Sequence, residues 1–321
     1  MKKLNCSRCS LEVLAFLSRP PENCALPYFT YTLNPAHSFC ATGELIPGKT
    51  VLSPGDARAK GCAPLLCLSN LNPSGGFSPQ LAHSLFCDEA AQDKLMAELF
   101  TKLEAGDYYG VQLCFNYLFP FDRDNYSRFV SVLSQRLHAA GYLLCVELAP
   151  PELSSSAQDY AALGKSADRL SLMFCRWAHS FSPPQALAPL EALHRALEQS
   201  LERIPAHKLL LGISGLGYDW KLPWHQGDEA RAISCPRALE LARSQNAELK
   251  RDGSSAAPWF LYRDAEARRH AVFFEDGPSI EKKLRLVDEF SLAGIALYPG
   301  DRLPQSTLQI LESLHSTEKL L

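Results

Sequence analysis

Polar side chains alternate with apolar ones in residues 108–117, which read YYGVQLCFNY. Gln112, Cys114 and Asn116 are each separated by one apolar residue, so on a β-strand they share one face. A strand buried on both sides is normally apolar on both. The polar face therefore indicates either a strand that faces a binding or catalytic site, or an edge strand with one wetted face. Pattern alone leaves both interpretations open.

Other candidates for chemistry are few. Glu147 lies near the end of a predicted strand, and Glu275 and Asp276 precede a predicted helix, where a carboxylate typically caps the helix. The nine histidines lack metal-ligand spacing, and neither a phosphate loop nor a Gly-x-Ser-x-Gly elbow is present. Of the eleven cysteines, only Cys6 and Cys9 form a close pair, without the second pair that a zinc ribbon needs. We therefore expect no metal, no cofactor and a reducing environment.

Short apolar runs recur with helical patterns between them, which is typical of parallel βα units. Eight such units indicate a closed (β/α)8 TIM barrel within the α/β class. The predicted strands are Leu11–Leu17, Tyr28–Leu33, Ala63–Leu68, Val111–Asn116, Tyr142–Leu148, Arg169–Cys175, Lys208–Ser214 and Leu292–Tyr298. The clearest predicted helices cover residues 78–103, 122–139 and 184–204.

Almost eighty residues separate the seventh and eighth predicted strands, far more than one helix requires. Two β-like runs, 259–262 and 271–274, flank a charged turn and predict a hairpin, with a helix near 235–245 before it. We predict a small α+β insertion over residues 217–290. It belongs to a single barrel domain that spans residues 1–321.

The overall composition excludes several classes of partner. A formal net charge of -3 without a basic stripe gives no support for binding nucleic acid or an anionic membrane. The apolar run 11–17 is interrupted by Glu12 and followed by Arg19 and two prolines. We therefore expect neither a signal peptide nor a transmembrane segment.

The stretch 108–117 resembles the signature of glycoside hydrolase family 18, the chitinase-like barrels, whose fourth strand reads Asp-x-x-Asp-x-Asp-x-Glu. Tyr109, Gln112, Cys114 and Asn116 stand at the four acidic positions. In this family the Glu protonates the leaving oxygen, while an Asp two residues earlier orients the substrate's own acetamido group for attack. The resemblance implies that neither role is filled, because an amide is not an acid in water and a thiol is mostly neutral.

Two further family positions also differ. On the sixth strand the family usually reads Met-Thr-Tyr-Glu-Trp, and here Cys175 replaces the Tyr that holds the acetamido oxygen. On the eighth strand Tyr298 replaces the Trp beneath the sugar, although a Tyr can still stack on a ring. The resemblance therefore implies a catalytically degenerate site.

Within the family, the chain is most similar to the bacterial spore cortex-lytic N-acetylglucosaminidases. Matching stretches occur in the same order along the chain, at 63–71, 75–83, 124–126, 141–143, 211–220, 230–234 and 274–276. The resemblance and the aromatic content after the sixth strand together suggest sugar-binding residues. These are Trp177, Tyr218, Asp219, Trp220, Arg231 and Tyr298. The alternative is that the tryptophans only pin the insertion to the barrel.

Three functions follow as expectations. The favoured one is non-catalytic recognition of a glycan that contains N-acetylglucosamine, such as peptidoglycan, spore cortex or a chitin-like chain. The second is an active glycosidase that uses a relocated acid such as Glu147, and the third is a protein-interaction scaffold. We expect the protein to be cytoplasmic or spore-associated, and a protein partner stays open.

Overall fold

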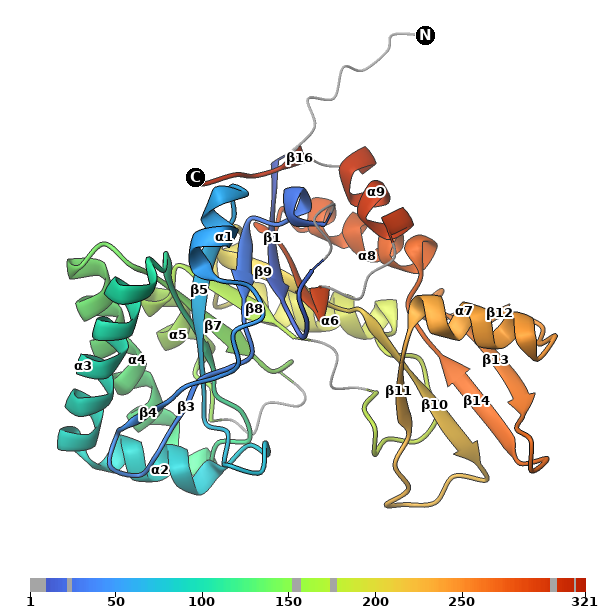
Figure 1. The fold of residues 1–321 in the computed structure, drawn as a ribbon, viewed down its shortest axis with the longest axis horizontal. Coiled ribbons are helices and arrows are strands. Elements are labelled where there is room, and N and C mark those ends of the chain that lie inside the picture. Colours follow the sequence, from blue (N-terminus) through green and yellow to red (C-terminus); the bar gives the residue numbers. More distant parts are fainter. Residues whose placement is uncertain (1–9, 22–24, 152–156, 174–177, 301–304, 315) are drawn as a thin grey trace, which may run out of the picture.

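Eight parallel strands form a closed ring, because β1 pairs with both β2 and β15. The computed structural model describes residues 10–21, 25–151, 157–173, 178–300, 305–314 and 316–321. The ring consists of β1 (Ser10–Phe16), β2 (Tyr31–Leu33), β5 (Ala63–Ser69), β6 (Gly110–Cys114), β7 (Leu143–Leu148), β8 (Arg169–Leu172), β9 (Leu209–Ser214) and β15 (Gly294–Tyr298). The predicted (β/α)8 barrel is confirmed, with the carboxyl ends of its strands toward the bottom of Figure 1.

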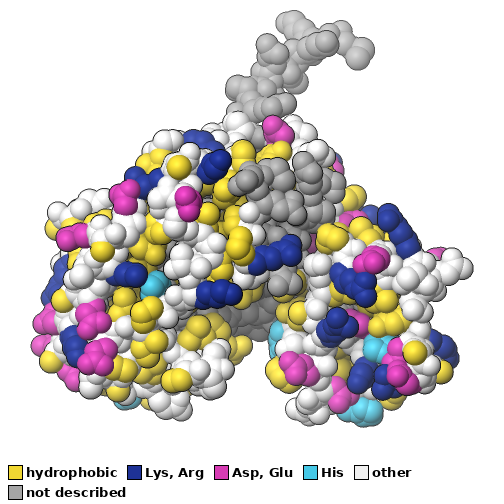
Figure 2. Space-filling view, in the orientation of Figure 1, with side chains coloured by type: hydrophobic (Ala, Val, Ile, Leu, Met, Phe, Trp, Pro, Cys, Tyr) yellow, Lys and Arg dark blue, Asp and Glu magenta, His cyan; other side chains and the backbone are white. Residues whose placement is uncertain are grey.

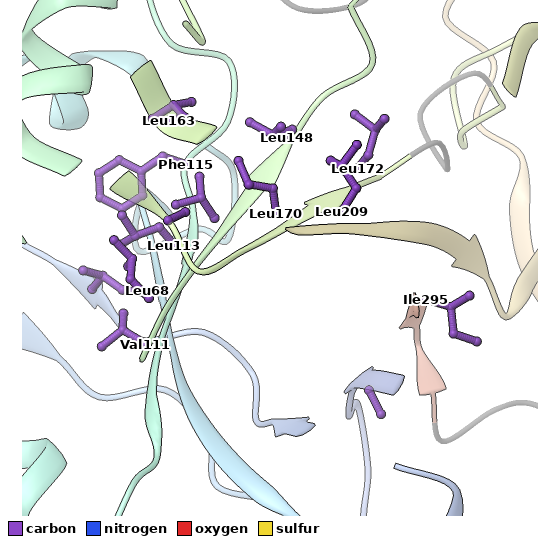
Figure 3. Packing of buried hydrophobic residues seen from close by; sticks show 14 of the residues in the cluster. Leu68, Val111, Leu113, Phe115, Leu148, Leu163, Leu170, Leu172, Leu209 and Ile295 are labelled. Carbon is purple, nitrogen blue, oxygen red and sulfur yellow. The ribbon is translucent and has the colours of Figure 1, made fainter. Parts of the chain in front are cut away.

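The alternation on β6 arises from the two sides of the barrel wall. Val111, Leu113 and Phe115 are fully buried and pack outward, in a cluster that also holds helix residues such as Leu163 (Figure 3). The intervening polar residues point into the barrel, where Cys114 packs with the inner cluster. Of the two interpretations of this strand, the edge strand is wrong, because β6 has β5 and β7 on its two sides.

Helices cover the outside of the ring. They are α1 (Pro54–Ala59), α2 (Pro79–Cys87), α3 (Glu89–Gly106), α4 (Arg123–Ala139), α5 (Tyr160–Ser166), α6 (Leu190–Leu201), α8 (Gly277–Glu289) and α9 (Gln305–Leu314). Short 3-10 turns occupy Leu26–Tyr28, Pro120–Asp122 and Ala206–Lys208. Within the described parts of the chain, no helix combines the length and apolar character needed to cross a membrane.

Two helix predictions need correction. The predicted helix 78–103 is two helices, because Asp88 is extended and its side chain accepts hydrogen bonds from the backbone N–H groups of Ala90 and Ala91. An Asp in this role starts a new helix. The predicted helix 184–204 begins only after Pro189, as α6. The predicted helix 122–139 corresponds to α4, which begins one residue later at Arg123, and the Asp122 side chain makes no capping bond.

The insertion between β9 and β15 is an antiparallel sheet with one helix, as predicted. It consists of β10 (Leu216–Leu222), β11 (Arg231–Ser234), α7 (Cys235–Ser244), β12 (Lys250–Arg251), β13 (Pro258–Arg263) and β14 (Arg269–Phe273). The strand order is β11-β10-β14-β13-β12, with β13 and β14 forming the hairpin. In Figure 1 this unit lies to the right of the barrel, on the side of the strands' carboxyl ends.

The amino-terminal side of the barrel is held by polar contacts and short strands. Arg169 makes two contacts with the buried carboxylate of Glu12, one of them 2.6 Å from Nε to Oε2. The strand β16 (Ser316–Thr317) pairs with the start of β1, and the Lys319 ammonium donates to the Phe29 carbonyl at 2.6 Å. A separate ribbon of β3 (Ser38–Phe39) and β4 (Leu45–Ile46) lies outside the ring.

The carboxylates that precede α8 have separate roles. Asp276 caps the helix in a capping box with Ser279, so the predicted cap is confirmed there. Glu275 instead lies fully inside the protein, where its Oε2 is 2.7 Å from the buried ammonium of Lys283 and accepts from the Ser279 hydroxyl at 2.6 Å. Removing one partner of such a pair leaves the other charge buried without compensation, which strongly destabilises the fold.

Replacing Lys283 with Met should therefore lower the free energy of unfolding by about 3–5 kcal/mol, because the Glu275 carboxylate stays buried without its cation. Urea denaturation measures the difference. Arg285→Met is the matched control on the same helix, because its partner Glu281 is solvent-accessible and such pairs contribute about 1 kcal/mol or less. Equal losses in the two variants would contradict the role of the buried pair.

Candidate functional site

Asn116 lies just beyond the end of β6, where a hydrogen-bonded frame fixes its position. The Asn70 side chain accepts from the Asn116 backbone N–H at 3.0 Å and donates to the Asn116 carbonyl at 2.9 Å. The Asn116 side chain donates from Nδ2 to Glu147 Oε1 at 2.9 Å. Both side chains are buried, with 3% and 9% of their residue surface exposed. The contact joins the ends of two neighbouring strands, β6 and β7.

This arrangement leaves Asn116 able to donate a hydrogen bond but not a proton. Its Oδ1 has no hydrogen-bond partner among the described residues. An unpartnered buried amide oxygen is an acceptor that a ligand donor can satisfy. The carboxyl group at this end of the barrel belongs instead to Glu147, one strand along the sheet.

Cys114 is equally unsuited to the work of a carboxylate. Burial, followed by hydrogen bonding to Cys67, raises the pKa of the Cys114 thiol well above its ordinary value. The two sulfur atoms are 3.3 Å apart. The strand register sets Cys67 opposite Gln112 rather than Cys114, so the thiols meet diagonally across the strands. Cys114 is therefore a neutral group in the barrel interior.

Two further candidate residues lie closer to the amino end of β6: Gln112 is on the strand and Tyr109 directly precedes it. The Gln112 side chain is fully buried and donates from Nε2 to the Ser171 hydroxyl on β8 at 3.2 Å. Tyr109 precedes β6, is half-buried and packs against the inner cluster. Sequence reasoning missed Asn70 and Ser171, because their partners are 46 and 59 residues away along the chain.

The insertion corrects two predicted binding residues. Trp220 is fully buried, and its indole N–H donates to the Ser182 carbonyl at 2.6 Å. Its ring packs with Ala178 and Leu187, which follow β8. Trp220 therefore pins the insertion to the barrel and cannot stack on a sugar, as the alternative interpretation of the tryptophans expected.

Asp219 is the second correction. Its carboxylate accepts from the Tyr262 hydroxyl at 2.8 Å and lies 2.8 Å from His270 Nδ1. Both partners are on the hairpin β13–β14, and the Asp219 side chain is almost fully buried. Its hydrogen-bonding capacity is thus used to hold the sheet together rather than offered to a ligand.

Three other predicted ligand residues remain accessible. Tyr298, at the carboxyl end of β15, is 48% exposed and meets Phe16 edge-on at 5.5 Å between ring centres. Tyr218 is half-buried on β10 and Arg231 is exposed on β11. Their binding roles stay predictions. The predicted residues Cys175 and Trp177 lie outside the described residues.

Figure 2 shows a notch between the barrel and the insertion, on the side where the barrel strands end.

Sequence reasoning also missed an aromatic pair in the barrel loops, in which Phe77 lies 5.7 Å from Tyr117 between ring centres. The Tyr117 ring is well exposed, and its residue has a positive φ of 55°. In the sequence, Tyr117 directly follows the predicted strand Val111–Asn116 and Phe77 directly precedes the predicted helix 78–103, but nothing there pairs the two rings.

The arrangement has the parts of a binding site for a neutral ligand. The described residues contain no group of three or more His, Cys, Asp or Glu side chains arranged to hold a metal ion. The polar groups that the structure describes at the ends of β6 and β7 include the Asn116 amide, the neutral Cys114 thiol and the Glu147 carboxylate, and Tyr298 contributes an exposed aromatic face. Such groups hydrogen-bond hydroxyls and cover the C–H faces of a ring.

Comparison with known proteins extends the resemblance found in the sequence. Residues 66–302 match the model of Glycosyl hydrolases family 18. The chain is 32% identical over 305 residues to the cortical fragment-lytic enzyme of Bacillus subtilis (strain 168), covering 92% of this chain and 70% of that protein.

Two solved structures share the fold. The spore cortex-lytic enzyme SleL of Bacillus cereus superposes with a TM-score of 0.90 at 27% identity, over 98% of this chain and 76% of that one. A chitinase from Chromobacterium violaceum superposes with a TM-score of 0.85 at 26% identity, over 94% and 98% of the two chains.

The buried thiols make stability depend on pH. Burial also raises the pKa of the Cys145 thiol well above its ordinary value. Above about pH 9 the unfolded chain loses thiol protons that the folded protein keeps, so the free energy of unfolding falls as pH rises, by about 1.4 kcal/mol per pH unit for each such thiol. Below that pH the contribution is fully present.

Urea denaturation between about pH 9 and pH 10 should show this slope reduced by about 1.4 kcal/mol per pH unit in Cys114→Ala. The control is the same comparison between about pH 6 and pH 7, where thiols stay protonated in both states and the slopes of Cys114→Ala and the parent protein should be equal. An unchanged slope in Cys114→Ala would mean that the Cys114 thiol already ionises in the folded state.

Proposed function

Because the chain belongs to glycosyl hydrolases family 18, we propose that it recognises a glycan containing N-acetylglucosamine without hydrolysing it by the family route. The relatives named above include a cortical fragment-lytic enzyme, a spore cortex-lytic enzyme and a chitinase. A fragment of spore-cortex peptidoglycan is accordingly the first ligand class to test, and a chitin-like oligosaccharide is the second.

The observation that carries the proposal is the chemistry at the end of β6. Asn116 occupies the place of the general acid, and its amide donates to Glu147 instead of supplying a proton. Cys114 occupies the place of the carboxylate that orients the acetamido group, and its thiol is buried and neutral. The loss of a general acid alone costs about two to four powers of ten in rate.

Several features of the site support retained binding. The exposed faces of Tyr298 and Tyr117 suit a sugar ring. The buried Oδ1 of Asn116 is an unused acceptor, which a hydroxyl or acetamido N–H could reach only if the side chains that cover it move. The exposed guanidinium of Arg231 adds donors on the insertion.

The Asn116–Glu147 contact favours a second candidate, an active glycosidase in which Glu147 is the acid. Glu147 Oε1 lies within 2.9 Å of the amide at the family's acid position, so its carboxyl group is displaced by only about the length of one hydrogen bond. This candidate still lacks a carboxylate at Cys114 to hold the acetamido group.

The first experiment incubates the purified protein with cortex muropeptides and with chitooligosaccharides, and reads thermal unfolding on the same samples. We expect a raised melting temperature, since a ligand at one hundred times its Kd stabilises the folded state by about 2.7 kcal/mol. Tyr298→Ala should remove most of that shift, as should Trp177→Ala. Leu249→Ala, at an exposed position on the insertion, is the control that should leave the shift unchanged.

Mass spectrometry of those incubations separates the two candidates. Intact sugars support recognition, whereas cleavage products that vanish in Glu147→Gln support the relocated acid. Asn116→Glu alone should not produce cleavage, because Cys114 still occupies the orienting position. Neither cleavage nor a thermal shift with any of these sugars would reject both candidates and leave the protein-interaction scaffold.

A further inference from the structure

A thiol, an imidazole and a carboxylate come together on the outer side of the barrel, away from the polar face of β6. Cys87 is the last residue of α2, and His83 lies one turn earlier on the same helix. The Cys87 sulfur is 3.8 Å from each ring nitrogen of His83. His83 Nδ1 is 2.8 Å from Oδ1 of Asp122, in the 3-10 turn before α4.

The carboxylate fixes the orientation of the imidazole. Asp122 is fully buried, and its other oxygen, Oδ2, has no hydrogen-bond partner among the described residues. A carboxylate only accepts hydrogen bonds, so His83 Nδ1 must be the donor in this contact. In a neutral ring Nε2 is then the acceptor. The Cys87 sulfur, equidistant from the two ring nitrogens, lies beside the ring, and rotation of the exposed Cys87 side chain brings its thiol to the Nε2 lone pair.

Aromatic rings hold the imidazole from its sides. Phe119 and Phe121 stack on each other at 4.9 Å, and both meet His83 edge-on, with ring centres 6.2 Å and 5.4 Å away. The thiol itself remains open to solvent. The result is an exposed nucleophile beside a base that a third group orients, which is the general arrangement of an activated cysteine.

We propose that Cys87 is a nucleophilic thiol and a site of covalent modification by small disulfides. The thiol proton passes to His83 Nε2 and the sulfur attacks one sulfur of the disulfide. The disulfide bond breaks, a new bond forms between Cys87 and one half of the reagent, and the other half leaves as a thiolate that takes the proton from His83. The exchange needs no further oxidant or reductant.

The position of Cys87 makes the imidazole necessary. The carboxyl end of a helix carries partial negative charge and does not stabilise a thiolate. Any rate advantage at Cys87 beyond simple exposure must therefore come from His83. This dependence distinguishes an activated thiol from one that is merely accessible.

The test exposes the full chain to glutathione disulfide at neutral pH and follows each cysteine by peptide mass mapping. Cys40, which is half-buried beside Glu44, is the reference within the same molecule. We expect mixed disulfide to form at Cys87 at least about tenfold faster than at Cys40, and His83→Gln to reduce that ratio by about tenfold, as loss of a base does.

Added imidazole should restore the rate in His83→Ala, which a purely structural role for His83 would not allow. Asp122→Asn should lower the ratio as well, because the ring loses the acceptor that orients it. The ratio of Cys87 to Cys40 corrects for any general loosening of a variant. An unchanged ratio in His83→Gln, or equal rates at the two cysteines in the parent protein, would overturn the proposal.

Discussion

Pairing of the first barrel strand with the last is the constraint from which the rest of the structure follows. Once β1 joins β15, every strand has an inside and an outside, and no edge is left in the ring. Outward residues meet the helices and must be apolar. Inward residues meet one another in a narrow interior that excludes water, so each polar group there needs a partner from another strand.

Inside the barrel, polar side chains contact one another across different strands, both near the amino ends and near the carboxyl ends of the strands. Glu12 and Arg169 join β1 to β8 near the amino ends of the strands, Gln112 joins β6 to β8, and Asn116 meets Glu147 at the carboxyl ends. Gln112 Oε1 and Asn116 Oδ1 both lack a hydrogen-bond partner among the described residues, and the contact at the carboxyl ends differs in that it includes a carboxylate, Glu147. The same strand can therefore carry a structural contact at one point along its length and a candidate site residue near its carboxyl end.

The sequence predicted the barrel well because its signals are local. Period-two alternation located β6, and the number of βα units implied closure. Features that depend on distant partners could not be predicted in the same way. Trp220 is buried because residues that follow β8 pack against it. The Asp122 carboxylate contacts His83 instead of capping the helix that it precedes. Asp88 broke a helix because a local capping preference outweighed an apolar pattern that continues through it.

The contact between Asn116 and Glu147 also limits which residue can stand at position 116. A carboxylate at position 116 would lie within hydrogen-bond distance of the Glu147 carboxylate, and two such groups cannot both be ionised cheaply in a buried setting. With Glu147 present, a Glu at position 116 would therefore lower the stability of the folded protein unless one of the two carboxyl groups is protonated. Positions 116 and 147 therefore form one electrostatic unit, in which the effect of a change on β7 depends on the residue at the end of β6.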